Sequence, residues 1–153
     1  MRPAAGFRPT IDNAVVIDKA TDVEGTYQPG VCNIGPAEIA RRRRSAIAAT
    51  AITLLVAAGM LLARWPDVTR LALLPFAAGT AVAWLQVTRR FCVAFGSAGI
   101  LNFGDLGTTV NVEDGEARAA DRRTALRMIL EGLVCGGVVT LLFWILPAWI
   151  LPA

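Results

Sequence analysis

The chain has 153 residues, of which 55% are hydrophobic and only 18% are charged. Soluble domains carry roughly 25% charged residues, so this composition argues against a soluble globular domain. The net charge of +3 does not indicate nucleic-acid binding, because the basic residues are gathered in short runs beside apolar stretches. The chain contains no His, which excludes imidazole catalysis and His-ligated metal or haem.

Residues 1–31 are predicted to be a flexible cytoplasmic segment. Pro3, Pro9, Pro29 and several Gly interrupt it, and no helical or strand periodicity is sustained. Its apolar runs are shorter than the roughly 7–15 residues of a signal peptide, so we expect the first span itself to direct insertion. A turn at Gln28-Pro29-Gly30 is expected to end the segment.

Residues 32–104 are predicted to form a juxtamembrane helix, a transmembrane hairpin and an interfacial segment. Pro36 suits the first turn of a helix, because the N–H that Pro lacks would be unbonded there. The uncharged stretches Ser45–Ala63 and Leu71–Thr88 approach the roughly 20 residues that cross a bilayer. In the short loop between them, Asp67 is expected to cap the second helix.

The uncharged stretch 91–104 follows the hairpin. It is too short to cross a bilayer and too apolar for open solvent, so an interfacial or re-entrant segment is expected. Both hairpin helices are rich in small residues, which permit the close backbone approach on which helix packing in lipid depends.

Residues 105–153 are predicted to be a cytoplasmic connection and a third transmembrane helix. Asp114-Gly115 is typical of a turn. A helix is expected from Glu116, running without a break into the uncharged stretch Gly132–Ala153.

Two further features of the third helix can be read from spacing. Arg127 and Glu131 are four residues apart, which predicts a surface ion pair at the membrane edge. Gly132 and Gly136, with Gly137 beside them, form a small-residue face that favours close association with another helix.

The arginine clusters predict the orientation. Arg41–Arg44 precede the first span, Arg89–Arg90 follow the second, and further Arg lie within 118–127. Cytoplasmic flanks carry an excess of Lys and Arg, whereas only Arg64 and Arg70 bound the opposite loop. The predicted fold is therefore an all-α membrane protein with three transmembrane helices, a two-helix hairpin plus a third span. Its N-terminus is cytoplasmic and its C-terminus is outside.

The three cysteines are the reactive candidates. Cys32, Cys92 and Cys135 are all predicted to lie on the cytoplasmic side, where thiols stay reduced. The basic neighbours of Cys92 make it the first candidate for thiol or persulfide chemistry. The alternative is that these residues serve as small apolar side chains in packing. Their spacing matches no zinc pattern, and no metal or cofactor site is expected.

Two stretches beside the hairpin share a pattern with a known family. Residues 32–41 read Cys-Asn-Ile-Gly-Pro-Ala-Glu-Ile-Ala-Arg, and residues 90–100 read Arg-Phe-Cys-Val-Ala-Phe-Gly-Ser-Ala-Gly-Ile. Together they resemble the YgaP-like two-helix inner-membrane domain family, over residues 32–104. The resemblance implies a membrane hairpin that self-associates and, in some members, carries a rhodanese. This chain has no rhodanese, lacks the Pro after Cys92 and adds a third span, so only Cys92 matches a position with an implied sulfur-related role.

The sequence predicts a small multi-pass protein with a structural or accessory-subunit role and no catalytic activity. Carriers and pumps place ionisable groups within their spans, and these spans have none. A homo-oligomeric channel or transporter component, and a membrane thiol or persulfide carrier using Cys92, are the alternatives. The expected partners are the lipid bilayer and either further copies of the chain or another subunit of a membrane complex. The near-exclusive use of Arg over Lys indicates a GC-rich bacterial genome. The expected location is the bacterial cytoplasmic (inner) membrane.

Overall fold

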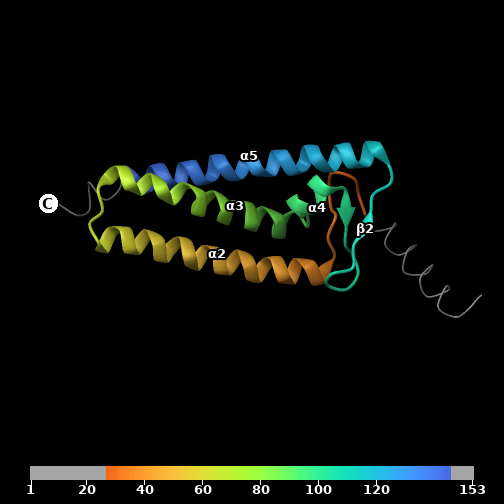
Figure 1. Ribbon diagram of the computed structural model, residues 1–153, viewed down its shortest axis with the longest axis horizontal. Helices are drawn as coiled ribbons and strands as arrows, with labels where there is room; N and C mark the ends of the chain where they lie inside the picture. Colours follow the sequence, from red (N-terminus) through yellow and green to blue (C-terminus); the bar gives the residue numbers. More distant parts are fainter. Residues whose placement is uncertain (1–26, 146–153) are drawn as a thin grey trace, which may run out of the picture.

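The computed structural model describes residues 27–145, and three long helices dominate it (Figure 1). In chain order the elements are α2 (Pro36–Leu62), the 3-10 helix η1 (Asp67–Leu73), α3 (Leu74–Thr88), α4 (Val93–Ala98), β1 (Ile100–Leu101), β2 (Val110–Asn111) and α5 (Gly115–Ile145). Helix α3 lies between α2 and α5 and packs against both. Helix α2, the continuous pair η1–α3, and α5 are each long and apolar enough to cross a membrane. The predicted all-α membrane protein with three transmembrane helices is confirmed.

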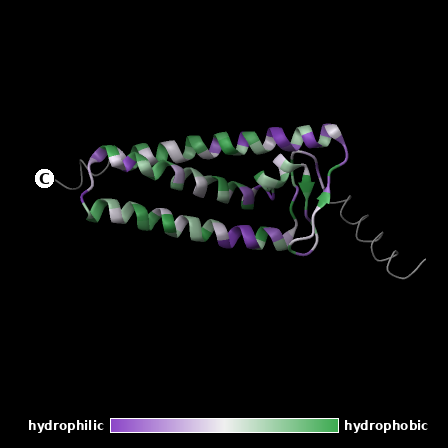
Figure 2. Ribbon diagram, viewed as in Figure 1, coloured by the Kyte–Doolittle hydropathy of each residue, from purple (hydrophilic) through white to green (hydrophobic). Residues whose placement is uncertain are grey.

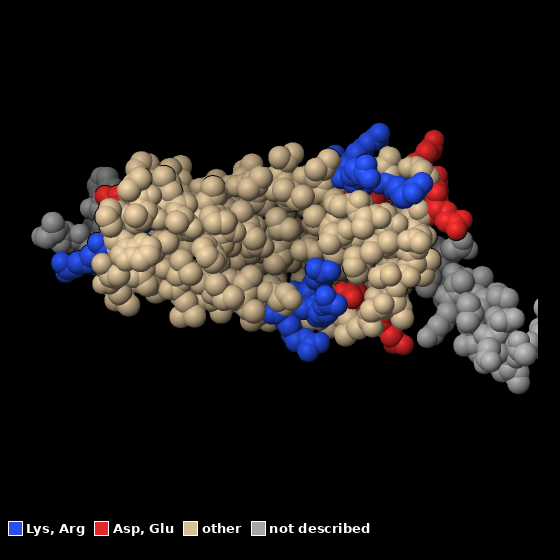
Figure 3. Space-filling view, in the orientation of Figure 1, with Lys and Arg blue, Asp and Glu red and all other residues tan. Residues whose placement is uncertain are grey.

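One end of the bundle is more polar than the rest of it, and we call this end the cap. It comprises residues 27–35, residues 89–114 and the first half of α5, residues 115–128. Figure 2 shows that hydrophilic segments of α2 and α5 lie toward this end, and Figure 3 shows most of the Lys and Arg side chains there. The chain enters α2, leaves α3 and enters α5 at the cap, so the three arginine clusters share one end of the molecule.

The predicted segments at the two ends of the chain are described only in part. Residues 1–26 of the N-terminal segment and residues 146–153 of the third span lie outside the described residues. The expected turn at Gln28–Gly30 is confirmed, and Gln28 forms an isolated bridge with Cys32 across it. Residues 27–31 differ from the loose segment that was predicted, because they are hydrogen-bonded to α5.

Helix α2 begins at Pro36, as expected, with Gly35 as its N-cap. The N–H of Gly35 donates to the carbonyl of Asn102 over 2.7 Å. A Cβ at Gly35 would lie 2.8 Å from the Cα and carbonyl oxygen of Phe103, closer than real Cβ contacts allow. The start of the first span is therefore fixed to the segment that follows the second.

The loop between the first two spans differs from the prediction in one respect. Pro66, and not Asp67, is the N-cap residue, and the next seven residues form η1 before the α-helix begins. The Asp67 carboxylate instead accepts an ion pair from Arg70, 2.9 Å away and three residues on. Pro75 lies in the first turn of α3, directly after η1, where the chain passes from 3-10 to α-helix.

Helices α2 and α3 are joined by side-chain hydrogen bonds along the span. The hydroxyls of Thr53 and Thr80 are 2.8 Å apart, and Thr53 also donates to the carbonyl of Phe76. The indole N–H of Trp84 donates to the hydroxyl of Thr50 over 3.0 Å. Such bonds between helices satisfy polar groups that lipid cannot.

Helices α3 and α5 approach each other through small residues. Gly132 and Gly136 of α5 are buried against Ala78 and Val82 of α3. A Cβ at Gly136 would lie 2.5 Å from the Cα of Ala78, whereas one at Gly137 would meet nothing within 4 Å. The predicted small-residue face is thus used for packing within the chain.

The segment after the second span folds onto α5. Phe91 is fully buried against Ala125 and Met128, and α4 packs along the same helix. The two-residue strands β1 and β2 pair in antiparallel fashion, with Ile100 opposite Asn111. The predicted interfacial position of this segment relative to lipid stays a prediction.

Two local predictions near α5 are corrected. Asp114 is not part of a turn but caps α5, because its carboxylate accepts from the N–H groups of Glu116 and Ala117 at 3.0 and 3.3 Å. Glu131 pairs with Arg89 at the end of α3, at 2.6 Å, and not with Arg127. The close approach of α3 and α5 brings Arg89 within reach, so the ion pair joins two helices.

Candidate functional site

The cap collects most of the buried polar side chains of the described residues. Asn33, Glu38, Asn102 and Asp121 are each no more than 1% exposed, and all four lie in or beside it. Buried polar groups need hydrogen-bond partners, so their contacts define how this end of the molecule is built.

Asp121 anchors the turn that precedes the first span. One carboxylate oxygen accepts from the Tyr27 hydroxyl over 2.8 Å, and the other accepts from the N–H of Gly30 over 2.6 Å. One turn further along α5, the Thr124 hydroxyl donates to the carbonyl of Gly30 over 2.8 Å. Gly30 has a φ of 72°, a conformation that glycine adopts without strain. One face of α5 therefore bonds both the backbone N–H and the backbone carbonyl of Gly30.

The same contact changes the acidity of Tyr27. Burial raises the pKa of its phenol from 10.0, and the hydrogen bond to Asp121 raises it further because deprotonation would place two negative charges together. Tyr27 therefore stays a donor across the physiological pH range.

Asn33 joins the two stretches on which the family resemblance depends. Its side-chain oxygen accepts from the N–H of Cys92 over 2.7 Å, and its side-chain nitrogen donates to the Cys92 carbonyl over 3.1 Å. Its backbone N–H donates to the carbonyl of Arg90, and its backbone carbonyl accepts from the N–H of Asn102. Asn33 alone therefore supplies hydrogen-bond partners to the backbone of Arg90, Cys92 and Asn102.

Cys92 is fully buried and is the N-cap of α4. Its sulfur accepts from the N–H of Phe95 over 3.5 Å and from the guanidinium of Arg42 over 2.8 Å. The sequence pointed to Arg89 and Arg90 as the basic neighbours, but the guanidinium in contact comes from α2. Arg42 also lies 5.7 Å from the ring centre of Phe95 and 3.8 Å from the buried carboxylate of Glu38. This arrangement ties α2 to α4 and leaves the sulfur without solvent access.

The structure does not bring the three cysteines together as one site. Cys32 lies half-buried in the turn before α2, while Cys135 is exposed on α5. None of the three forms a disulfide. Among residues 27–145, no group of three or more His, Cys, Asp or Glu side chains is placed to hold a metal ion.

Asp121 was not among the residues that the sequence indicated, and Asn33 was indicated only as part of the stretch that carries the family resemblance. A signal for Asp121 exists, because the buried residues of α5 follow one another at intervals of three or four, and Asp121 lies on that stripe. The stripe consists of Ala117, Asp121, Ala125, Met128, Gly132, Gly136 and Thr140. A carboxylate in an otherwise small and apolar stripe indicates a buried acceptor.

Comparisons with models of known protein families, with curated proteins and with solved structures give no match. The resemblance to the YgaP-like domains stays a prediction. The two stretches that carry the resemblance nevertheless lie against each other, since Asn33 contacts Cys92 and Gly35 lies against the backbone of residues 102–103.

Proposed function

We propose that this protein is a non-catalytic accessory subunit of a bacterial cytoplasmic-membrane complex. The observation that carries the proposal is that the carboxylate, amide and thiol side chains of the cap that could do chemistry are taken up by structural contacts. Asp121, Asn33 and Cys92 are buried, and the side chain of each is hydrogen-bonded to another segment: those of Asp121 and Asn33 to backbone groups, and that of Cys92 to the guanidinium of Arg42. Groups held in this way stabilise a shape and are not exposed to a substrate.

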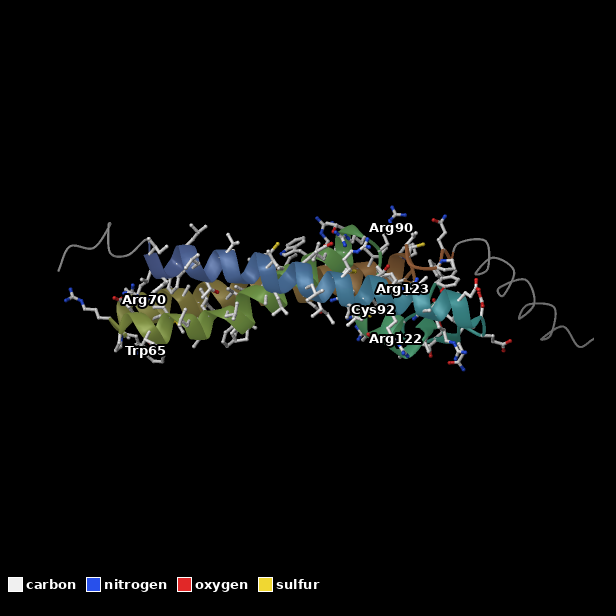
Figure 4. All side chains as sticks on the ribbon, turned by 90° about the horizontal axis from the view of Figure 1, so that it is seen from above. Trp65, Arg70, Arg90, Cys92, Arg122 and Arg123 are labelled. Atoms are coloured by element: carbon white, nitrogen blue, oxygen red, sulfur yellow. The ribbon has the colours of Figure 1, made fainter. Side chains whose placement is uncertain are left out.

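The distribution of charge supports a cytoplasmic cap. All three arginine clusters lie at that end, and Figure 4 shows Arg90, Arg122 and Arg123 there, with Trp65 and Arg70 at the other. An excess of Arg on one flank of every span is typical of the cytoplasmic side. The N-terminus would then be cytoplasmic and the C-terminus outside.

The exposed surface of the cap is the proposed contact surface. Leu106, between the two strands, is 50% exposed, and Val110, in β2, is 53% exposed. Arg122 and Arg123 are exposed on α5. Exposed apolar side chains and arginines on the same end of the molecule fit a partner that offers an acidic and apolar surface.

Photo-crosslinking in the native membrane tests this proposal. A photoreactive amino acid at Leu106 or Arg123 should capture one defined polypeptide, and the same group at Trp65 should not. Native mass spectrometry of the gently extracted protein should find that polypeptide in a fixed ratio. A homo-oligomer alone would contradict the subunit role and favour the channel hypothesis, and an isolated monomer would contradict both.

A second candidate, a thiol or persulfide carrier, is favoured by one contact. The guanidinium of Arg42, 2.8 Å from the Cys92 sulfur, would stabilise negative charge developing there. Reaction would require α4 to move away, because the sulfur is fully buried. A sulfur-mass adduct that is lost in Cys92→Ser but kept in Cys135→Ser would support this candidate, and equal adducts in both variants would refute it.

A further inference from the structure

A groove of about 910 Å³ opens between the first turns of α2 and the last turn of α3. Its charged lining comes from Arg43, Arg44 and Arg90, and its apolar wall includes Ile39, Ile47 and Val87. Of the described residues that line it, none is acidic. The groove therefore combines positive charge with an apolar wall.

These three arginines are not used to neutralise carboxylates of the protein. Their neighbours are used in this way, since Arg41 and Arg42 face Glu38, and Arg89 pairs with Glu131. Within residues 27–145, Arg43, Arg44 and Arg90 have no carboxylate within ion-pair distance. Three unpaired guanidinium groups around one groove favour an anionic ligand.

The groove lies where both helices change from charged to uncharged residues. On α2 the last charged residue is Arg44, and on the continuous pair η1–α3 the residues before Arg89 are uncharged back to Leu71. Ile47 and Val87 belong to the uncharged stretches, and the arginines lie just outside them. Ile47 and Val87 are therefore at acyl-chain depth and the arginines at headgroup depth, while Ile39 lies on the cap side of the arginines.

Arg90 has an unusual backbone conformation, which makes a clean substitution possible at this position. Arg90 follows the C-cap of α3 with a φ of 50°, and the N–H of Phe91 bonds back to the carbonyl of Gln86. Gly is the usual residue at this position, because a side chain strains a left-handed backbone. Arg90 is also one of the residues that line the groove.

We propose that this groove binds the headgroup phosphate of an anionic phospholipid, with Arg43, Arg44 and Arg90 as its ligands. An acyl chain of the same lipid lies along Ile47 and Val87. The bound lipid contacts both α2 and the end of α3 and so holds them together. The site binds one lipid in a defined stoichiometry, which distinguishes it from the diffuse attraction of basic residues to the membrane. The proposal does not depend on the accessory-subunit role.

Native mass spectrometry of the delipidated full chain in neutral detergent tests the proposal. Phosphatidylglycerol and phosphatidylcholine are titrated separately, and one phosphatidylglycerol should bind about tenfold more tightly, the effect of one strong charge-assisted contact. Arg90→Gly removes the charge and relieves the backbone strain, so it should lower phosphatidylglycerol affinity without lowering the melting temperature. Arg43→Gln/Arg44→Gln, on the exposed face of α2, should lower the affinity by a similar factor.

Matched variants separate this site from general electrostatics. Arg64 has the same left-handed backbone, at a φ of 49°, after α2 at the opposite end of the bundle. Arg64→Gly and Arg122→Gln/Arg123→Gln should leave phosphatidylglycerol affinity unchanged. Equal binding of the two lipids, or an equal loss in all these variants, would overturn the proposal. Displacement of the lipid by millimolar inorganic phosphate would also overturn it, in favour of a free-anion site.

Discussion

The cap and the membrane-spanning part of this molecule hold the same three helices together by different means. In the cap, buried carboxylate and amide side chains bond to backbone groups far away in the sequence, as Asp121 does to Gly30 and Asn33 to Cys92. Along the spans, α5 meets α3 through Gly132 and Gly136, and α2 meets α3 through a few hydroxyl and indole groups.

The difference follows from the solvent on each side. The non-helical backbone of the cap must find hydrogen-bond partners, and side chains that reach between segments supply them. A helix in lipid has already satisfied its backbone, so close packing between small residues is the main stabilising contact. We therefore expect the loss of a buried carboxylate acceptor in the cap to cost most, disruption of small-residue packing in the spans to come next, and the loss of a single polar contact in the spans to cost least.

The largest effect is expected for Asp121→Ala. The substitution leaves the N–H of Gly30 and the hydroxyl of Tyr27 without their acceptor, and the loss should be about 3 kcal/mol in the free energy of unfolding. Denaturant unfolding in mixed micelles measures this change. Glu113→Ala removes an exposed carboxylate from the same region and should change stability by less than about 0.5 kcal/mol. Equal effects of the two substitutions would contradict the anchoring role of Asp121.

Gly136→Ala should have the next largest effect. Its methyl group would meet the backbone of Ala78, so α3 and α5 must separate, at a cost of about 1–3 kcal/mol. Gly137→Ala is the matched control, because its methyl group meets nothing within 4 Å and Ala favours the helix. The same unfolding measurement distinguishes them. A destabilised Gly137→Ala with an unaffected Gly136→Ala would place the helix contact on the wrong face.

Tyr27→Phe should cost about 1 kcal/mol at neutral pH, the value of one hydrogen bond. The raised pKa of Tyr27 adds a pH dependence. Because the unfolded phenol loses its proton near pH 10 while the folded one keeps it, this contribution is complete below pH 10 and is lost as the pH rises above it. Unfolding curves between pH 8 and about 11 should show a steeper alkaline loss for the wild type than for Tyr27→Phe. An equal alkaline loss of stability in the wild type and in Tyr27→Phe would show that the Tyr27 phenol does not cause it.

The spans, their order and the start of α2 could be predicted because they depend on local properties. Length, absence of charge and the chemistry of Pro36 act within a few residues. The ion pair of Glu131 could not be predicted, because its partner Arg89 is brought close only by the packing of α3 on α5. Spacing along one helix favoured Arg127 and carried no information about the neighbouring helix.

The cap shows the same limit more strongly. Asn33 and Cys92 are far apart in the sequence, and neither neighbourhood indicates that the amide side chain will bond to the N–H and carbonyl of Cys92. Arg42 reaches Cys92 only because the start of α2 packs beside α4. The burial of Asp121 could have been predicted, since helical spacing places it on the same face of α5 as Ala117 and Ala125.

The smallest effect is expected for Thr53→Val, which removes a hydroxyl bonded to Thr80 and to the carbonyl of Phe76 while keeping the side-chain shape. Hydrogen bonds between helices in membranes contribute only about 0.6 kcal/mol on average, because the unfolded state in the membrane also finds partners. Thr88→Val is the control, since the hydrogen bonds of the Thr88 hydroxyl stay within its own helix. Denaturant unfolding of both variants beside Asp121→Ala sets the scale. A loss at Thr53 as large as that at Asp121 would mean that polar contacts, and not small-residue packing, determine how the spans associate.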